Sequence, residues 1–365
     1  MDNHDCIDSK LLHSDENTLF IIGNGFDLYH GLKSSYYDFA KYLQSHGGKA
    51  LKNTLETCLI ADDLWGNFEA NLARLNREIL IENVGNMLDV LPDTLDEEDD
   101  NFSYADFYAS IDIACQPVDD IEYKLPKFFK KWVQTLQIQK KENNDFFVNL
   151  LASKSRYLSF NYTDFLETLY NIPYENIKYI HGCRKNKTET LILGHAENTN
   201  ENFDLWYEQN KNRFTVHKHR YAIKKNKKGK IIRFRRPESM TELAYFDLEP
   251  EKGNWPSAMH YYAHENAIER IEEYFETTRK QSKQIISDNN EYFRSLSKIT
   301  SIIVLGHSLQ PVDYPYFKKI IIENENPLNL QWHISFYSDN DIRSIEKFRS
   351  AMNIPQSTVK LFRLP

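Results

Sequence analysis

The stretch "TLFIIGNGFDLYHGLKSSYYDF", residues 18–39, combines a short apolar run, a glycine-rich loop and a helix start. Residues 18–22 are apolar and end at Gly23, a pattern typical of a buried strand. Ser35 and Asp38 have the spacing of a capping box, so we expect a helix to begin there after about a dozen residues of loop. A strand, a glycine-rich loop and a helix in this order predict an α/β fold.

Further strand signals follow along the chain, and most of them precede a polar loop and a helix start. They lie in the segments 157–160, 176–182, 190–195, 300–317, 332–337 and 358–364. Strands that alternate with helical patterns favour an open, mainly parallel, Rossmann-like sheet. The predicted core is discontinuous and comprises residues 18–50, 151–199 and 298–365. Residues 51–150 predict a helical insertion, and residues 200–297 predict a second one with a basic hairpin and a long helix at 260–297.

The composition limits the classes of protein that need to be considered. The chain has 365 residues, of which 41% are hydrophobic, and a net charge of −8, so bulk charge does not attract nucleic acid. Its four cysteines form no CxxC pair, and no metal site is predicted. No apolar run is long enough for a membrane span, so we expect a cytoplasmic protein. Walker, Gly-x-Ser-x-Gly and HExxH motifs are absent.

Glycine and polar residues gather at the predicted carboxyl ends of strands, where open α/β sheets bind ligands. Glycines at 23, 25 and 306 would let a nucleotide approach the backbone, although a tight turn has the same pattern. Asp27 would repel a phosphate, so it suits a ribose hydroxyl or a structural cap. His307 and Ser308 can form hydrogen bonds, and Asp313 is a natural N-cap for the next helix.

Two further strand ends supply candidate catalytic residues. Asn161 offers a hydrogen-bond donor and an acceptor, but a turn asparagine would look the same. His181 precedes a glycine and has an intrinsic pKa near 6.5, which suits a general base. A structural histidine is the alternative for that position.

Several of these stretches resemble one known family. They are "LFIIGNGFDLYHGLKSSYYDF", "LWGNFE", "SFNYTDFLETLY", "YIHG" and "IIVLGHSLQPVDYPYF". In this order they resemble the AbiH family of bacterial abortive-infection (anti-phage) proteins. The resemblance extends from about residue 18 to the C-terminus and is weakest in the insertions.

More remotely, the set is similar to sirtuin-like NAD-consuming domains. That similarity implies NAD as a substrate, no permanently bound cofactor, Asn161 on the nicotinamide ribose or attacking water, and His181 as the catalytic base. It implies nucleotide contacts at Gly23, Asn24, Gly25, Phe26, Asp27, Gly306, His307, Ser308, Asp313, Ser338 and Asp339. The zinc ribbon of protein deacylases is missing, which favours simple NAD hydrolysis over acyl-lysine substrates.

Other functions remain open at this point. Residues 211–236 contain twelve Lys or Arg and no Asp or Glu, with aromatic residues between them. This segment would let the protein sense or act on nucleic acid, although a solvated hairpin has the same composition. A phage-derived trigger and a homo-oligomer are further expected partners, and a non-catalytic nucleotide-binding module that signals by assembly is a third function.

Overall fold

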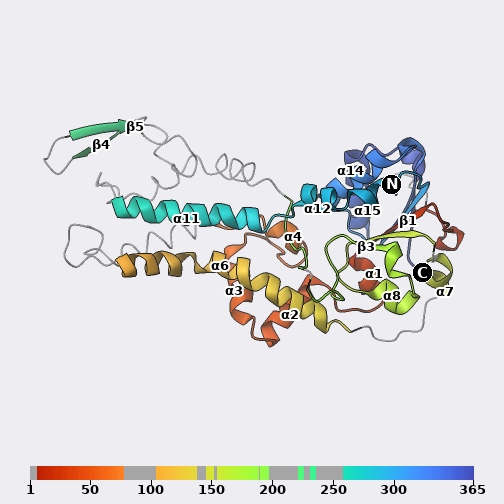
Figure 1. Ribbon diagram of the computed structural model, residues 1–365, viewed down its shortest axis with the longest axis horizontal. Coiled ribbons are helices and arrows are strands. Elements are labelled where there is room, and N and C mark those ends of the chain that lie inside the picture. Colours follow the sequence, from red (N-terminus) through yellow and green to blue (C-terminus); the bar gives the residue numbers. More distant parts are fainter. Residues whose placement is uncertain are drawn as a thin grey trace. The chain divides into compact units, whose positions relative to one another are not determined.

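The computed structural model of the chain describes residues 6–77, 104–137, 145–151, 154–188, 190–196, 221–225, 231–235 and 258–365. The chain divides into two compact units. Unit 1 comprises residues 1–48, 126–196 and 280–365, and unit 2 comprises residues 49–125 and 197–279. Their elements are labelled in Figure 1. Each unit is therefore assembled from segments that are far apart in the sequence.

Unit 1 is built on a six-stranded sheet. Its strands are β1 Thr18–Ile22, β2 Arg156–Ser159, β3 Ile177–Tyr179, β6 Ser301–Leu305, β7 Gln331–Ser335 and β8 Val359–Phe362. They lie in the order β3-β2-β1-β6-β7-β8, and each neighbouring pair is parallel. The predicted Rossmann-like α/β fold is confirmed, as an all-parallel open sheet with helical insertions. The strand order reverses between β1 and β6, where sheets of this class bind their ligands.

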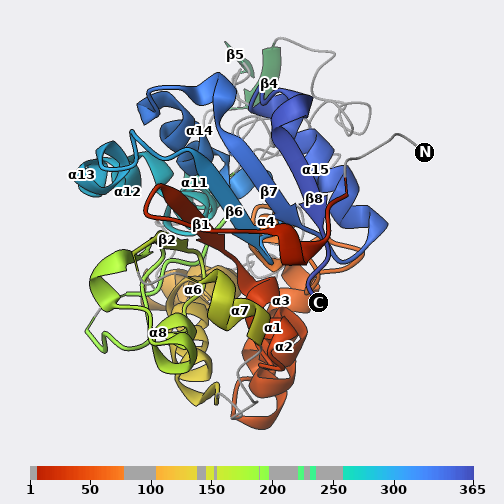
Figure 2. The ribbon, with the colours of Figure 1, turned by 90° about the vertical axis from the view of Figure 1, so that its right-hand side faces the viewer.

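Two hydrophobic cores cover the two faces of this sheet. Successive side chains of a strand point to opposite faces, so Leu19 and Ile21 enter one core and Phe20 and Ile22 the other. The first core is completed by α12 Ser282–Asp288, α13 Asn290–Arg294, α14 Tyr314–Glu323 and α15 Asp339–Ala351. The second is completed by α1 Asn24–Tyr29, α7 Asp145–Leu150 and α8 Phe165–Tyr170. Figure 2 shows these two helix layers on opposite sides of the sheet.

The connection after β1 contains a helix that the sequence analysis did not predict. α1 begins at Asn24, directly after Gly23, so the expected loop of about a dozen residues is wrong. A helix of six residues is not stable by propensity; here it is held by burial of Phe26 in the second core. Ser35 caps α2 Tyr36–Ser45, as the capping-box pattern predicts, because its hydroxyl accepts a hydrogen bond from Asp38 N at 3.2 Å.

Two other predicted elements differ from the structure. Residues 191–194 have no regular secondary structure, so the strand expected at 190–195 is wrong. The backbone hydrogen bonds of this segment, from Ile192 N to His181 O at 3.0 Å and from Lys280 N to His195 O at 2.7 Å, go to two separate parts of the chain, whereas a ladder needs a series of bonds to one neighbouring strand. The long helix expected at 260–297 is divided into α11 Ala258–Thr277, α12 and α13. Thr278 directly follows α11, and its hydroxyl donates to Tyr274 O at 2.6 Å.

Unit 2 contains helices from both insertions and one hairpin. Among the described residues its helices are α3 Lys49–Cys58, α4 Phe68–Asn71, α11 and the part of α6 Tyr104–Thr135 that precedes residue 126. Arg270 on α11 forms ion pairs with Asp112 and Asp119 on α6, with N–O distances of 2.5 and 3.5 Å. β4 Tyr221–Lys225 pairs antiparallel with β5 Ile231–Arg235, which confirms the predicted hairpin. Its turn and the rest of the basic segment lie outside the described residues.

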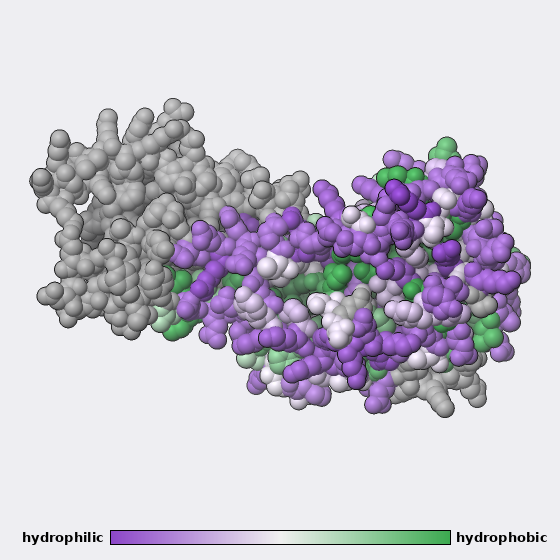
Figure 3. Space-filling model, in the orientation of Figure 1, coloured by the Kyte–Doolittle hydropathy of each residue, from purple (hydrophilic) through white to green (hydrophobic). Residues whose placement is uncertain are grey.

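The described surface is mostly hydrophilic in the view of Figure 3. Some large apolar side chains, such as Tyr337 and Ile322, are exposed, which is normal for a protein surface. Among the helices of the described residues, none is both long and apolar enough to cross a membrane.

Candidate functional site

Three glycines hold the loops after β1 and β6 in direct backbone contact. Gly306 has a φ of 64°, and a Cβ at this position would lie 2.1 Å from Phe26 N. A Cβ at Gly25 would lie 2.7 Å from Gly306 O, and one at Gly23 would lie 2.4 Å from the Cα of His307. Side chains cannot be accommodated at such distances from backbone atoms. The glycines therefore serve the packing of two backbone loops at the point where the strand order reverses.

This contact bears on the nucleotide contact predicted at these glycines. Gly23 N donates to Leu305 O at 3.0 Å, and Gly25 N donates to Gly306 O at 2.7 Å. These amides are thus bonded within the protein. A nucleotide contact at residues 23–25 stays a prediction, and it would require the bond from Gly25 to be exchanged for one to the ligand. Phe26 points into the second core, where its ring lies 5.1 Å from that of Phe147.

Asp27 ties the loop after β1 to the loop after β2. Its carboxylate accepts hydrogen bonds from Asn161 Nδ2 at 2.9 Å and from Thr163 Oγ1 at 2.6 Å. Burial raises the pKa of Asp27 to about 6, although the hydrogen bonds from Thr163 and Asn161 lower it. The sequence left two roles open for Asp27, a contact to a ribose hydroxyl and a structural cap. These hydrogen bonds serve the structural role, because they hold the loop after β1 in place.

The side-chain amide of Asn161 has a defined orientation. Its nitrogen donates to the Asp27 carboxylate and to Gly23 O at 3.1 Å. Because both partners are acceptors, the amide oxygen must face the other way. Among the described residues no group donates a hydrogen bond to this buried oxygen. An unmet buried acceptor is costly, so Asn161 Oδ1 is a place where a ligand hydroxyl or a water would bind favourably.

Four polar side chains meet beyond the carboxyl ends of β3 and β6, and we call them the Asp313 cluster. One carboxylate oxygen of Asp313 lies 3.4 Å from Lys280 Nζ and 3.9 Å from His181 Nε2. The other lies 3.4 Å from His307 Nε2. All four side chains are buried. The sequence analysis named His181, His307 and Asp313 separately, and the structure brings them together around one carboxylate.

Neighbouring groups fix the two imidazoles. Leu309 N donates to His307 Nδ1 at 2.9 Å, so the ring proton of His307 is on Nε2 and points towards Asp313. Leu309 has a φ of 51°, a left-handed conformation that costs energy for a branched residue and occurs at functional sites. His181 Nε2 lies 3.3 Å from the hydroxyl of Tyr316, and the Phe160 ring packs edge-on against both imidazoles.

The cluster places an ionised carboxylate beside a neutral imidazole. Burial would raise the pKa of Asp313, but Lys280, His307 and His181 together hold it well below its ordinary value. Burial and the charge of Lys280 lower the pKa of His181 well below 6.5, against the opposing effect of Asp313. At neutral pH Asp313 is therefore negative and His181 is neutral. Environments that separate two titrating groups in this way are typical of acid–base sites.

Lys280 is the member of the cluster that sequence reasoning missed. It falls inside the helix predicted at 260–297, where a lysine among other charged residues reads as solvent-exposed. In the structure it follows the end of α11, its side chain is buried, and its main-chain nitrogen donates to His195 O at 2.7 Å. The consecutive Thr277 and Thr278, which are poor helix formers, are the only local sign that the helix ends there.

Other predicted site residues lie at several places in unit 1. Asp313 occupies the N-cap position of α14, but its side chain makes no capping bond and joins the cluster instead. Asn24 Nδ2 donates to Ser34 O at 2.9 Å, and Ser308 is exposed. Ser338 caps α15 as predicted, in a capping box with Asp341, and Asp339 is exposed beside it. In the described part of the chain, the hydrogen bonds of Ser338 are made within the start of α15 and not to the Asp313 cluster.

The donor set of the Asp313 cluster does not suit a metal ion. His307 directs a protonated nitrogen at the carboxylate, and the ammonium of Lys280 takes the place where a cation would bind. In the part of the chain that the structure describes, no group of three His, Cys, Asp or Glu side chains is placed to hold a metal.

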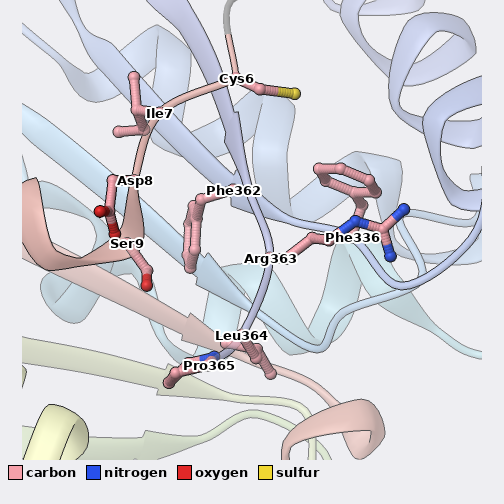
Figure 4. Close-up of a pocket in the computed structure, with 9 residues that line it drawn as sticks. All are labelled: Cys6, Ile7, Asp8, Ser9, Phe336, Phe362, Arg363, Leu364 and Pro365. Atoms are coloured by element: carbon pink, nitrogen blue, oxygen red, sulfur yellow. The ribbon is translucent and has the colours of Figure 1, made fainter.

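A cavity of about 340 Å³ opens elsewhere in unit 1, beyond β7 and β8. Its lining residues, shown in Figure 4, are Cys6, Ile7, Asp8, Ser9, Phe336, Phe362, Arg363, Leu364 and Pro365. The guanidinium of Arg363 lies over the Phe336 ring, 4.6 Å from its centre. None of the catalytic or nucleotide-contacting residues predicted from the sequence lines this cavity.

Comparison with known proteins identifies the family. The model of the family described as "Bacteriophage abortive infection AbiH" matches residues 19–336. The chain therefore belongs to the AbiH family of phage-defence proteins. No match was found among curated proteins or among solved structures.

Proposed function

We propose that this AbiH protein is a defence effector that binds NAD or a related nucleotide and hydrolyses the bond between nicotinamide and ribose. The observation that carries the proposal is the ionised Asp313 beside the neutral His181 at the carboxyl ends of the parallel strands. The strand order supports it, because sheets with this order bind dinucleotides. The choice of NAD rests on the resemblance to sirtuin-like domains that the sequence motifs suggest.

The reaction needs few groups. The bond from the ribose C1′ to the nicotinamide nitrogen breaks, and its electron pair leaves with nicotinamide, whose positive charge is thereby neutralised. A water oxygen forms the new bond to C1′, and its proton passes to His181 and then to solvent. The negative charge of Asp313 favours the oxocarbenium-like state between these steps, as carboxylates do in glycoside hydrolysis. The products are ADP-ribose, nicotinamide and one proton.

Asn161 is suited to orient the substrate. Its Oδ1 is a buried acceptor that no described residue satisfies, while its nitrogen is held by Asp27 and Gly23. A ribose hydroxyl or the attacking water would donate to this oxygen. Orientation of this kind can contribute several kcal/mol to a barrier reduction.

The cluster is closed in this structure. His181 is 2% exposed and Asp313 is 7% exposed, so a substrate can reach them only after the surrounding chain has opened. An effector that is toxic to its own cell needs such a closed state. We therefore expect turnover to depend on a phage-derived trigger.

The test measures nicotinamide release and the disappearance of NAD, by mass spectrometry, in cells that express the protein during phage infection. Its variants are His181→Gln and Asn161→Ala. His333→Gln is the control for the first, because His333 is a partly buried histidine on β7 of the same sheet. Thr163→Val is the control for the second, because it removes the other hydrogen bond to Asp27 and leaves Asn161 in place.

The proposal predicts that NAD falls in cells with the parent, His333→Gln or Thr163→Val. The rate should drop on the order of 10²-fold or more in His181→Gln and Asn161→Ala. Protection against phage with unchanged NAD in the parent would refute NAD hydrolysis. Stabilisation of the purified protein by a nucleotide that is not turned over would instead favour a binding module.

A second function is favoured by the β4–β5 hairpin. Its described strands belong to the segment 211–236, which has twelve basic and no acidic residues. We propose nucleic-acid sensing by this hairpin as the alternative, or as an addition to the effector site. Binding of single- or double-stranded oligonucleotides should weaken steeply as salt rises from 50 to 200 mM. Binding that is absent or insensitive to salt would exclude it.

A further inference from the structure

Lys280 lies where the inserted chain returns to the sheet-containing unit. Unit 1 is interrupted after Ala196 and resumes at Lys280, so residues 197–279 form one continuous excursion into unit 2. The main-chain nitrogen of Lys280 donates to His195 O at 2.7 Å. His195, next to the point where the chain leaves unit 1, is thus hydrogen-bonded to Lys280, where the chain returns to unit 1.

The side chain of the same residue reaches the Asp313 cluster. Lys280 Nζ lies 3.4 Å from Asp313, and the lysine side chain is only 1% exposed. Lys283, three residues further along, is exposed on α12. Of these two nearby lysines, Lys280 at the junction has its side chain buried in the protein, and Lys283 does not.

We propose that Lys280 is the positioning residue through which the inserted segment 197–279 acts on the Asp313–His181 pair. Its main chain is fixed at the junction with His195, and its ammonium group holds the Asp313 carboxylate beside the two histidines. The charged or titratable groups that face Asp313 among the described residues are Lys280, His181 and His307.

The physical basis is the short distance between junction and site. A change at the junction moves the lysine backbone, and the attraction between two charges at 3.4 Å in a buried place falls quickly as they separate. Withdrawal of Lys280 would leave Asp313 held by the histidines alone, and His181 would then bind a proton more readily. A trigger that binds the insertion would thereby alter the reactive pair without touching it. This inference rests on the proposed function, because it treats Asp313 and His181 as the reactive centre.

A purely structural ion pair is the competing interpretation, and the test separates the two. The variants are Lys280→Met, which removes the charge, and Lys280→Arg, which keeps it, with Lys283→Met as the control on α12. Another variant inserts two glycines between Arg279 and Lys280, which loosens the junction but retains the lysine. Its control inserts two glycines after Leu328, an exposed residue in the connection between α14 and β7 within unit 1.

Two measurements do not depend on NAD chemistry. The first is protection of cells against phage, measured as plating efficiency. The second is the titration of the His181 ring, followed by NMR of the purified full chain with labelled histidine and assigned with His181→Gln. Urea unfolding of every variant reports whether it is folded under the assay conditions.

Lys280→Met should lose protection at least about tenfold and raise the midpoint of His181 by about one pH unit. Lys280→Arg should stay closer to the parent, the insertion at the junction should shift both readouts in the direction of Lys280→Met, and both controls should match the parent. If Lys280→Met fails to fold, Lys280→Arg and the junction insertion decide.

A His181 titration that is unchanged in folded Lys280→Met would overturn the proposal, and so would parental protection in that variant. A junction insertion that changes neither protection nor the His181 titration would indicate a purely structural role for Lys280 and would also overturn the proposal. If Lys280→Met loses protection while the parent never consumes NAD, NAD hydrolysis fails and the role of Lys280 stands.

Discussion

Asp27 and Asn161 are joined by a 2.9 Å hydrogen bond between a buried carboxylate and a buried amide, 134 positions apart in the chain. The bond connects the ends of two adjacent parallel strands, β1 and β2. Asn161 also donates to Gly23 O, so one side chain holds both Gly23, the N-cap of α1, and Asp27 in its first turn. The geometry of the loops at the centre of the sheet depends on this pair.

The stability of the protein should fall as pH rises because of Asp27. Its pKa is raised to about 6 in the folded state, so ionisation opposes folding between its unfolded value near 3.9 and about 6. The contribution is present at low pH and is lost as pH rises through 6. In Asp27→Asn this loss is absent. The unfolding free energy of the variant, relative to that of the parent, should therefore rise by about 2 kcal/mol between pH 4.5 and pH 7.5.

Urea unfolding of both proteins at these two pH values measures the effect. The difference between variant and parent isolates Asp27, because the other titrating groups are common to both. A difference in unfolding free energy that is the same at both pH values would contradict the raised pKa.

Gly306→Ala should be much more destabilising than Gly47→Ala. Both glycines have a positive φ, of 64° and 77°, which costs about 1 to 2 kcal/mol for alanine. Only at Gly306 would the new Cβ also meet backbone, 2.1 Å from Phe26 N, whereas nothing lies near it at Gly47. We expect an extra cost of at least about 2 kcal/mol at Gly306, measured by urea unfolding. Equal costs would show that the two loops are not packed as described.

Asp313 and Lys280 should be strongly coupled in stability. Asp313→Asn leaves the buried Lys280 without its carboxylate and should cost about 3 to 5 kcal/mol. Because the pKa of Asp313 is lowered, its contribution is present above its unfolded value near 3.9 and is lost as pH falls below it. The double variant with Lys280→Met should cost less than the sum of the single changes by about 1 to 3 kcal/mol. Additive costs in a double-mutant cycle would contradict the pairing.

The two aspartates at the start of α15 should separate capping from ligand binding. Asp341 accepts hydrogen bonds from Tyr337 N and Ser338 N, so Asp341→Asn should lose about 1 kcal/mol of unfolding free energy. Asp339 is exposed, and Asp339→Asn should leave stability unchanged. If Asp339 contacts an adenine ribose, the same variant should weaken nucleotide binding in a thermal-shift titration. Unchanged binding would remove Asp339 from the predicted contacts.

The sequence predicted most of the sheet because its strands carry a local signal. The run at residues 19–22 is apolar on both faces, as a central parallel strand must be, and it is followed at once by glycine. The segment 190–195 has a similar composition but makes no ladder, since pairing depends on what lies beside it. Tertiary context also produced α1, whose six residues are held by burial of Phe26.

The candidate site was predictable only in part. Residues such as His181, His307 and Asp313 follow strands, and the rule that strand ends converge at one edge of the sheet places them together. Lys280 follows a helix that appeared continuous in the sequence, so no periodic pattern pointed to it. The bond between Asp27 and Asn161 depends on the mutual orientation of two loops, which spacing along the chain does not specify.

The pairing of β1 with β6 has a consequence for how the protein is made. Thr18 lies opposite Ser301, so the two central strands are separated by about 280 residues of synthesis. At a synthesis rate of about 5 to 20 residues per second, about 15 to 60 s pass between the synthesis of β1 and that of β6. During that interval β1, β2 and β3 can pair, but the apolar edge of β1 stays uncovered and open to wrong partners. Nascent chains of this protein should therefore be clients of chaperones that shield exposed strands until the last third of the chain has emerged.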